Sequence, residues 1–165
     1  MVGTAVSTEA NEVKLRRFQT ADAAILRELL TETVRQVNKR DYTPAQIAAW
    51  APDDYDRQAW LERLQRNQPF VAEIDGSIVG FADVQADGYI DHFFCSASAQ
   101  GQGVGRALMN KLLAHSYPRF YANVSITARS FFEHFGFRLV REQQVIVRGV
   151  ELTNFLMERL RNAPK

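Results

Sequence analysis

Three of the nine glycines in this chain, Gly101, Gly103 and Gly105, fall within five consecutive residues. The aromatic and apolar run before them, residues 89–95, predicts a strand, and the apolar residues after them recur at helical spacing. A glycine turn between a strand and a helix forms an anion-binding site, because small residues let the backbone approach the ligand and the first N–H groups of the helix face it. Arg106, in the first turn of that helix, can add a direct contact with a phosphate group. The segment therefore predicts a phosphate-type site.

The spacing of these glycines excludes two familiar phosphate-binding loops. A P-loop ends in Gly-Lys-Ser or Gly-Lys-Thr, whereas Gly105 is followed by Arg106 and Ala107. A dinucleotide-binding fingerprint needs the pattern G-x-G-x-x-G at the start of a parallel β-α-β unit, which glycines at 101, 103 and 105 do not follow. A tight turn without a ligand is the alternative that spacing alone leaves open.

Length, composition and charge narrow the class of protein. With 165 residues, of which 46% are hydrophobic, the chain forms one globular domain or at most two very small ones. No apolar run approaches the roughly 18 to 20 residues that span a bilayer, so we expect a soluble protein without a membrane partner. Twenty Lys and Arg against nineteen Asp and Glu leave a net charge of +1, which argues against a general nucleic-acid binder. The single cysteine, Cys95, excludes an intrachain disulfide and a multi-cysteine zinc site, and it fits a cytoplasmic protein.

Apolar periodicity and turn signals predict the order β-α-α-α-β-β-β-α-β-α-β-β in one domain, residues 13–160. Residues 1–12 lack the pattern of a signal peptide and are expected to form a disordered tail. We expect Thr20 to cap the first helix, and Thr43, followed by a proline, to cap the second. The expected strands are residues 13–18, 70–74, 78–84, 89–95, 119–124, 140–147 and 150–157.

Two motifs carry a resemblance to a known family. Residues 100–105, Gln-Gly-Gln-Gly-Val-Gly, match the Q/R-x-x-G-x-G/A signature of the GNAT (GCN5-related) N-acetyltransferase superfamily. Residues 93–95 stand where that family has an apolar strand triplet, and residues 128–137 resemble its A-x-x-F-Y-E-x-x-G-F segment. The resemblance covers about residues 13–158 and extends to a bacterial subgroup without an assigned substrate.

This resemblance implies a fold and an activity. The fold is an α/β (α+β) acyl-CoA N-acyltransferase fold, a mixed, mostly antiparallel, curved sheet of about seven strands flanked by helices, with two parallel strands that diverge. The activity is direct transfer of the acetyl group of acetyl-CoA to a primary amine, expected to be a small molecule. Two alternatives stay open: a non-catalytic acyl-CoA-binding regulatory module, and acetylation of a protein or a charged tRNA. The final strand pair, residues 140–157, could serve a homodimer.

The resemblance also assigns cofactor contacts, without a metal. The pyrophosphate of acetyl-CoA is expected on the glycine turn, and the pantetheine arm is expected to pair with main-chain groups of the strand before it. Ser125 replaces an asparagine that many relatives carry, and Phe132 replaces the tyrosine that usually protonates the leaving thiolate. Water, Ser125 or Tyr121 could take over that proton transfer. The expected cofactor residues are Phe93, Phe94, Cys95, Gln100, Gly101, Gln102, Gly103, Val104, Gly105, Arg106, Ser125 and Phe132.

Three residues are candidates for the catalytic base, because an alkyl ammonium with a pKa of about 10 must lose a proton before it attacks. Strand alternation puts Tyr89 and Asp91 on the face of the expected thioester contacts and His92 on the opposite face. We rank Asp91 first, as base or amine-binding group, His92 second and Tyr89 third. The alternative, of equal weight, is a structural role in which Asp91 only accepts hydrogen bonds from nearby backbone donors. Cys95 is expected to be a buried strand residue and not a nucleophile.

Overall fold

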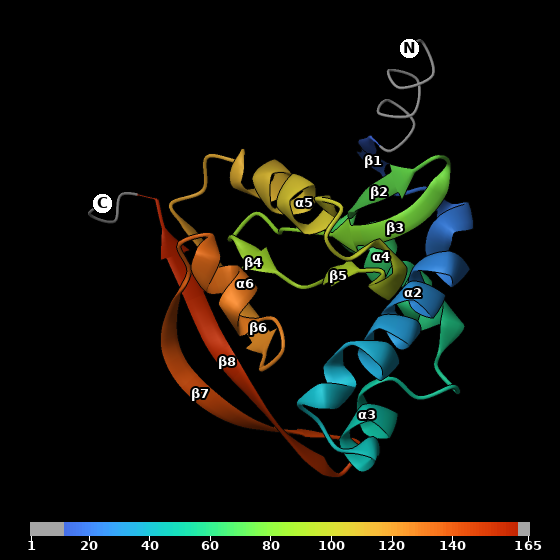
Figure 1. The fold of residues 1–165 in the computed structure, drawn as a ribbon, viewed down its shortest axis with the longest axis vertical. Coiled ribbons are helices and arrows are strands. Elements are labelled where there is room, and N and C mark those ends of the chain that lie inside the picture. Colours follow the sequence, from blue (N-terminus) through green and yellow to red (C-terminus); the bar gives the residue numbers. More distant parts are fainter. Residues whose placement is uncertain (1–11, 162–165) are drawn as a thin grey trace.

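Eight strands form two four-stranded sheets in residues 12–161, the part of the chain that the computed structural model describes (Figure 1). The predicted tail lies outside the described residues, except for its last residue. One sheet has the order β1-β2-β3-β5 and the other β4-β6-β8-β7. The strands are β1 (Val13–Arg17), β2 (Phe70–Ile74), β3 (Ser77–Ala82), β4 (Tyr89–Ile90), β5 (Phe93–Cys95), β6 (Arg119–Ser125), β7 (Arg138–Val147) and β8 (Val150–Leu160). The helices are α2 (Ala23–Gln36), α3 (Pro44–Trp50), α4 (Arg57–Asn67), α5 (Val104–Leu113) and α6 (Arg129–His134), with short 3-10 turns η1 (Thr20–Asp22), η2 (Asn38–Arg40) and η3 (Ala97–Ala99).

The two sheets separate in the middle of one predicted strand. β4 pairs in parallel with β6 through Tyr89 opposite Tyr121 and Ile90 opposite Ala122, whereas β5 pairs antiparallel with β3. The predicted continuous strand 89–95 is therefore wrong, because the chain leaves one sheet and enters the other within two residues. The predicted fold class is confirmed, including a parallel strand pair that diverges.

Hydrophobic cores lie on both faces of the β1-β2-β3-β5 sheet. Strand alternation sends Ala72 toward α5, where Leu108 is fully buried, and Val71 toward α2 and α4, where Leu26 is fully buried. The far end of the β7–β8 hairpin contributes Leu152 to the second core. The tip of the hairpin therefore packs against the helices α2 and α3 of the second core, and Figure 1 shows it next to α3.

Of the two predicted N-cap residues, Thr43 is confirmed and Thr20 is wrong. Thr43 caps α3: its Oγ1 accepts the N–H of Gln46 at 3.2 Å, and the Gln46 side chain accepts the N–H of Thr43 at 2.8 Å. Thr20 is not a cap, because it lies inside η1. The carboxylate of Asp22 instead accepts the N–H of Gln19 at 2.8 Å, so the acid three residues further on satisfies the helix entry.

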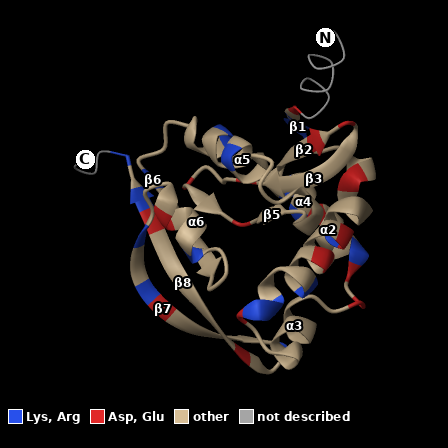
Figure 2. Ribbon diagram, in the orientation of Figure 1, with Lys and Arg blue, Asp and Glu red and all other residues tan. Residues whose placement is uncertain are grey.

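Charged residues of both signs lie along α2 and the β7–β8 hairpin (Figure 2). This distribution matches the balanced composition of the chain. No helix among residues 12–161 is long and apolar enough to span a bilayer.

Candidate active site

A cleft of about 520 Å³ opens between β5 and β6, where the two sheets separate. The glycine turn and α6 form one end of its wall. The end of α2 with η2 forms the other, through Thr33, Asn38 and Arg40. Nearly all of the cofactor residues expected from the sequence meet here: Phe93, Phe94, Cys95, Gln100, Gly101, Gly103, Val104, Gly105, Arg106, Ser125 and Phe132 line the cleft.

The glycine turn has the backbone of an anion cradle. Gly101 and Gly103 have φ values of +79° and +83°, and a Cβ on either would meet no protein atom within 4 Å. The space above these two residues is therefore open to a ligand. Gly103 directly precedes α5, whose first N–H groups have no carbonyl partner within the helix. The N–H of Gln102 does not belong to this set, because it donates to the carbonyl of Ala99 at 3.3 Å.

Gly105 has a different role in the same turn. A Cβ at this position would lie 3.0 Å from Cε1 of Phe131, so a larger residue would push the Phe131 ring away, and glycine favours this close approach of α5 to α6. The glycines at 101 and 103 thus leave room for a ligand, whereas the one at 105 serves helix packing.

The free edge of β5 presents main-chain groups to the cleft. His92 O accepts the N–H of Asp83 at 3.0 Å, and Ser96 N donates to Val79 O at 2.7 Å, so even-numbered residues bond to β3. Alternation then turns the main-chain groups of Phe93 and Cys95 away from β3, toward the gap between the sheets. The Cys95 carbonyl already accepts the hydroxyl of Thr33 at 3.2 Å.

The thiol of Cys95 is not poised for nucleophilic attack. Burial raises its pKa to about 12, so the thiolate is scarce at neutral pH. Cys95 lies on strand β5, as predicted, but it is only partly buried, because it lines the cleft.

Of the three candidates for the base, the structure brings only Asp91 to the cleft. Its carboxylate accepts two hydrogen bonds from the guanidinium of Arg63, and the side-chain amide of Asn67 donates a third at 2.8 Å. Burial works to raise the pKa of Asp91, but the hydrogen bonds from Arg63 and Asn67 and the nearby positive charge outweigh it. The pKa of Asp91 therefore lies below its usual value, and the group is ionised at neutral pH.

The other two candidates lie outside the cleft lining. His92 is buried with its ring against Trp60 and Phe81, at centroid distances of 5.4 Å and 5.8 Å. The hydroxyl of Tyr89 accepts a hydrogen bond from the Asn123 side chain at 3.3 Å, and burial raises its pKa. Neither side chain is placed to receive a proton from an amine in the cleft.

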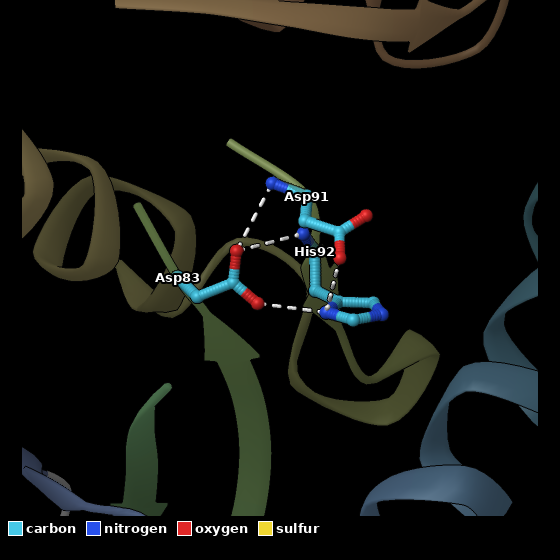
Figure 3. A group of neighbouring side chains, drawn as sticks. All are labelled: Asp83, Asp91 and His92. Atoms are coloured by element: carbon cyan, nitrogen blue, oxygen red, sulfur yellow. Dashed lines mark hydrogen bonds and ion pairs between the residues drawn. The ribbon is translucent and has the colours of Figure 1, made fainter. Parts of the chain in front are cut away.

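Sequence reasoning missed a fully buried carboxylate beneath Asp91. Asp83 directly follows β3 and accepts the main-chain N–H groups of Asp91 and His92 at 3.0 Å and 3.2 Å (Figure 3). Its other oxygen lies 2.7 Å from Nδ1 of His92 and 3.3 Å from the side-chain amide of Asn67. The sequence shows an acid directly after the apolar residues 77–82, but this position alone does not identify the partners of Asp83.

Asp83, Asp91 and His92 have the residue types of a metal site, and one atom from each lies within 4.8 Å of the others. The carboxylate oxygens, however, already accept N–H groups, two of them from the positive guanidinium of Arg63. Because these donors occupy the lone pairs that would bind a cation, the arrangement is that of a hydrogen-bonded network.

The wall beside the expected leaving group carries no tyrosine hydroxyl. Phe132 is 4% exposed, and its ring packs edge to face on Phe93 and Phe137 at 5.6 Å and 5.0 Å. The hydroxyl of Tyr121 donates to Asp87 at 2.7 Å, and Tyr121 does not line the cleft. Ser125 does line it.

Three residues of the cleft lining carry hydroxyls, and they differ in what their protons do. Thr33 donates to the Cys95 carbonyl, and Thr127 donates to Asp41 at 2.8 Å. Ser125 Oγ accepts the N–H of Ala128 at 3.1 Å, together with the side-chain amide of Asn38 at 3.4 Å. Among residues 12–161, its own proton has no acceptor, so it can be donated to a ligand.

A pair of diverging strands beside a glycine turn at a helix start defines an acyltransferase of the GCN5-related class. The chain belongs to the family described as Acetyltransferase (GNAT) domain, which matches residues 38–159. It is therefore an acetyltransferase, and the resemblance stated from the sequence is confirmed.

Individual relatives agree with this assignment. The uncharacterized N-acetyltransferase YafP of Escherichia coli (strain K12) is 36% identical over 147 residues, which cover 89% of this chain and 95% of YafP. The crystal structure of a GCN5-related N-acetyltransferase from Rhodopseudomonas palustris superposes with a TM-score of 0.85 at 26% identity, covering 89% of this chain and 94% of that one. YncA from Salmonella typhimurium, solved with acetyl-CoA, shares the fold with a TM-score of 0.62 at 19% identity, over 93% of this chain and 98% of that one.

Proposed function

We propose that this acetyltransferase transfers the acetyl group of acetyl-CoA directly to the primary amine of a small molecule. The observation that carries the proposal is the open space above Gly101 and Gly103, at the free N–H groups of α5 and continuous with a cleft that reaches Asp91. This arrangement suits a ligand with a pyrophosphate at one end and a reactive group at the other.

The chain's own groups fit acetyl-CoA as the donor. The turn supplies N–H groups for the pyrophosphate and Arg106 adds a positive charge, while the free edge of β5 suits the amides of the pantetheine arm. The N–H of Phe93, turned toward the gap, is the proposed donor to the carbonyl oxygen that becomes negative during attack. YncA, which has the same fold, was solved with acetyl-CoA.

Asp91 is the proposed site for the amine. Because its carboxylate is ionised and its pKa is lowered, it holds an ammonium group better than it removes a proton. We propose that Asp91 orients the amine and that water carries the proton away. The amine nitrogen then forms a bond to the acetyl carbon, the carbon–sulfur bond breaks, and the electron pair leaves with sulfur.

Ser125 is the proposed hydrogen-bond donor to the leaving sulfur. A thiol has a pKa of about 8.5, so a thiolate leaves without full protonation and needs only a donor to stabilise it. The free proton of Ser125 can supply that hydrogen bond, and bulk water then completes protonation.

Compartment and assembly are part of the proposal. A cytoplasmic location suits a chain with one free cysteine, because thiols there stay reduced. β7 is the edge strand of its sheet and exposes Leu139, Val140 and Ile146. We therefore still predict that two copies of the chain can form a homodimer through the β7–β8 hairpin.

One specific observation favours a second candidate function. The missing hydroxyl at Phe132 is what a non-catalytic acyl-CoA-binding module would show. Acetylation of a charged tRNA is less well supported, because positive and negative residues are mixed along the described helices and strands (Figure 2).

Thiol release from acetyl-CoA, measured against a panel of amines, tests the proposal. The panel should contain polyamines, amino acids, amino sugars, aromatic amines and short peptides, and calorimetry should measure acetyl-CoA binding separately. Binding with amine-dependent thiol release supports the transferase. Binding without release from any amine supports the regulatory module, and release with peptides alone would move the acceptor to proteins.

A further inference from the structure

We propose that Asp83 is a positioning residue of this active site and that it acts together with His92. The pair fixes the strand break between β4 and β5, and this break aims Asp91 into the cleft. The inference rests on the proposed acetyl transfer.

The contacts of Asp83 are all with the segment that must be positioned. One oxygen accepts the main-chain N–H groups of both Asp91 and His92. The other accepts the side-chain amide of Asn67 at 3.3 Å and lies 2.7 Å from Nδ1 of His92. Three N–H donors therefore meet one carboxylate, and the imidazole ring faces it at hydrogen-bond distance.

The carboxylate of Asp83 lies at the point where the two sheets separate. Ile90, just before the network, pairs with β6 in one sheet, whereas Phe93, just after it, pairs with β3 in the other. In an uninterrupted antiparallel ladder, a main-chain carbonyl of the β3 strand would accept the N–H of His92, whereas the N–H of Asp91 would point away from β3. Here a side chain accepts both, so the chain can change sheets without leaving buried donors unpaired.

The burial of this acid indicates more than a structural role. Asp83 is fully buried, and taking a carboxyl group out of water is unfavourable until hydrogen bonds compensate for it. A strand that only had to be stable could avoid this cost by continuing the β3 ladder. The network instead produces a break next to Asp91, the one candidate base in the cleft lining.

Asn67 links the buried carboxylate to Asp91. Its side-chain amide donates to Asp83 at 3.3 Å and to Asp91 at 2.8 Å, so both carboxylates share one donor group. Arg63, from the same helix, holds the other side of Asp91. Asp91 is thus fixed at its main chain by Asp83 (Figure 3) and at its carboxylate by Arg63 and Asn67 of α4.

His92 completes the pair as a donor. Since N–H groups of the main chain and of Asn67 already donate to both oxygens of Asp83, the 2.7 Å contact fits a His92 ring that carries a hydrogen on Nδ1. The ring is held between Trp60 and Phe81. Its function in this proposal is to orient Asp83, not to carry a proton.

Two substitutions of His92 distinguish the orientation of Asp83 from proton transfer. The side-chain nitrogen of asparagine can occupy the place of Nδ1, whereas that of glutamine falls near the place of Nε2. We expect His92→Asn to keep kcat within about threefold of wild type and His92→Gln to lower it at least tenfold, with acetyl-CoA affinity unchanged in both. The reverse order would overturn the positioning role and make Nε2 a proton carrier.

Asp83→Asn tests the carboxylate itself. Its amide oxygen keeps the two main-chain N–H groups, but its NH₂ group meets two further donors, His92 and Asn67. We expect kcat to fall at least tenfold, acetyl-CoA affinity to stay within threefold, and the pH dependence of kcat to shift because Asp91 is less firmly held. Hydrogen exchange of the Asp91 and His92 amides should accelerate, which is a readout independent of turnover.

A matched control is Asp22→Asn, which alters another buried aspartate that accepts a main-chain N–H and pairs with Arg16, on an element that does not line the cleft. It should lower the melting temperature and leave kcat and its pH profile unchanged. Wild-type kcat and unchanged amide exchange in Asp83→Asn would overturn the inference. Failure of the wild-type protein to release thiol with any amine would instead overturn the proposed function, while the amide exchange rates would still report on the positioning pair.

Discussion

The guanidinium of Arg63 donates two hydrogen bonds to the carboxylate of Asp91, from α4 to the break between β4 and β5. This pair leaves Asp91 charged but less basic, since the pKa of the carboxyl lies below its usual value. Arg63 holds the carboxylate in place before any substrate enters. An acceptor amine therefore meets a carboxylate whose position is fixed, which favours orientation over strong basicity.

Asp91→Asn should lower kcat/KM by about 10² or more while acetyl-CoA affinity stays unchanged, because the amine loses its charged partner. Steady-state kinetics with a true amine substrate, together with calorimetry, measures both quantities. A variant within about threefold of wild type would exclude a catalytic role. If Asp91 were only structural, the melting temperature would fall and the pH profile of the folded enzyme would stay the same.

We expect the carboxylate of Asp22 to make part of the folding stability depend on pH. The hydrogen bonds from Arg16 lower its pKa most, and they outweigh the opposing effect of burial. A lowered folded-state pKa stabilises the fold above the unfolded value of about 3.9, and this contribution disappears as the pH falls through the folded value. Asp22→Asn should therefore cost about 2 kcal/mol at pH 7 and converge with wild type in strong acid. Urea unfolding at a series of pH values checks this, and a constant difference down to pH 2 would contradict it.

Features that depend on neighbours in the sequence could be predicted. The cap at Thr43 and the glycine turn before α5 need only residues a few positions apart, and both were predicted from the sequence. The network around Asp83 could not be predicted, because Asn67 reaches it from another element. Alternation alone likewise predicted an unbroken strand 89–95, since nothing local indicates that a side chain replaces the ladder.

Gly103 tests the anion cradle. Gly103→Glu should raise the dissociation constant for acetyl-CoA at least 100-fold, because its side chain enters the open space above the turn and its charge repels the pyrophosphate. Gly103→Ala is the control, since it has the same strain of about 1 kcal/mol at φ +83° without the charge or the length. Alanine should bind within about tenfold of wild type by calorimetry. Equal affinity of a folded Gly103→Glu would remove the turn from the binding site.

The thiol of Cys95 should react slowly with alkylating reagents. With a thiol pKa of about 12, only about one molecule in 10⁴ carries a thiolate at pH 8, so alkylation by iodoacetamide should be far slower than that of a free thiol. Cys95→Ala should keep turnover within about threefold, because the proposed contacts of this residue are main-chain groups. Mass spectrometry follows the labelling. Rapid modification that abolishes activity, together with an inactive alanine variant, would make Cys95 a nucleophile after all.

Ser125 and Phe132 can be tested as a pair, because they offer alternative positions for a hydroxyl near the leaving sulfur. Ser125→Ala should lower kcat about tenfold, the value of one lost hydrogen bond in the transition state, while acetyl-CoA still binds. Phe132→Tyr alone should preserve or raise kcat. In the double variant, the tyrosine should recover at least part of the loss, which kinetics at saturating concentrations of both substrates will show. A steep loss in Phe132→Tyr with unaltered acetyl-CoA binding would mean instead that the Phe132 ring packs against the acetyl group or the acceptor, and the hydroxyl would then have to come from water.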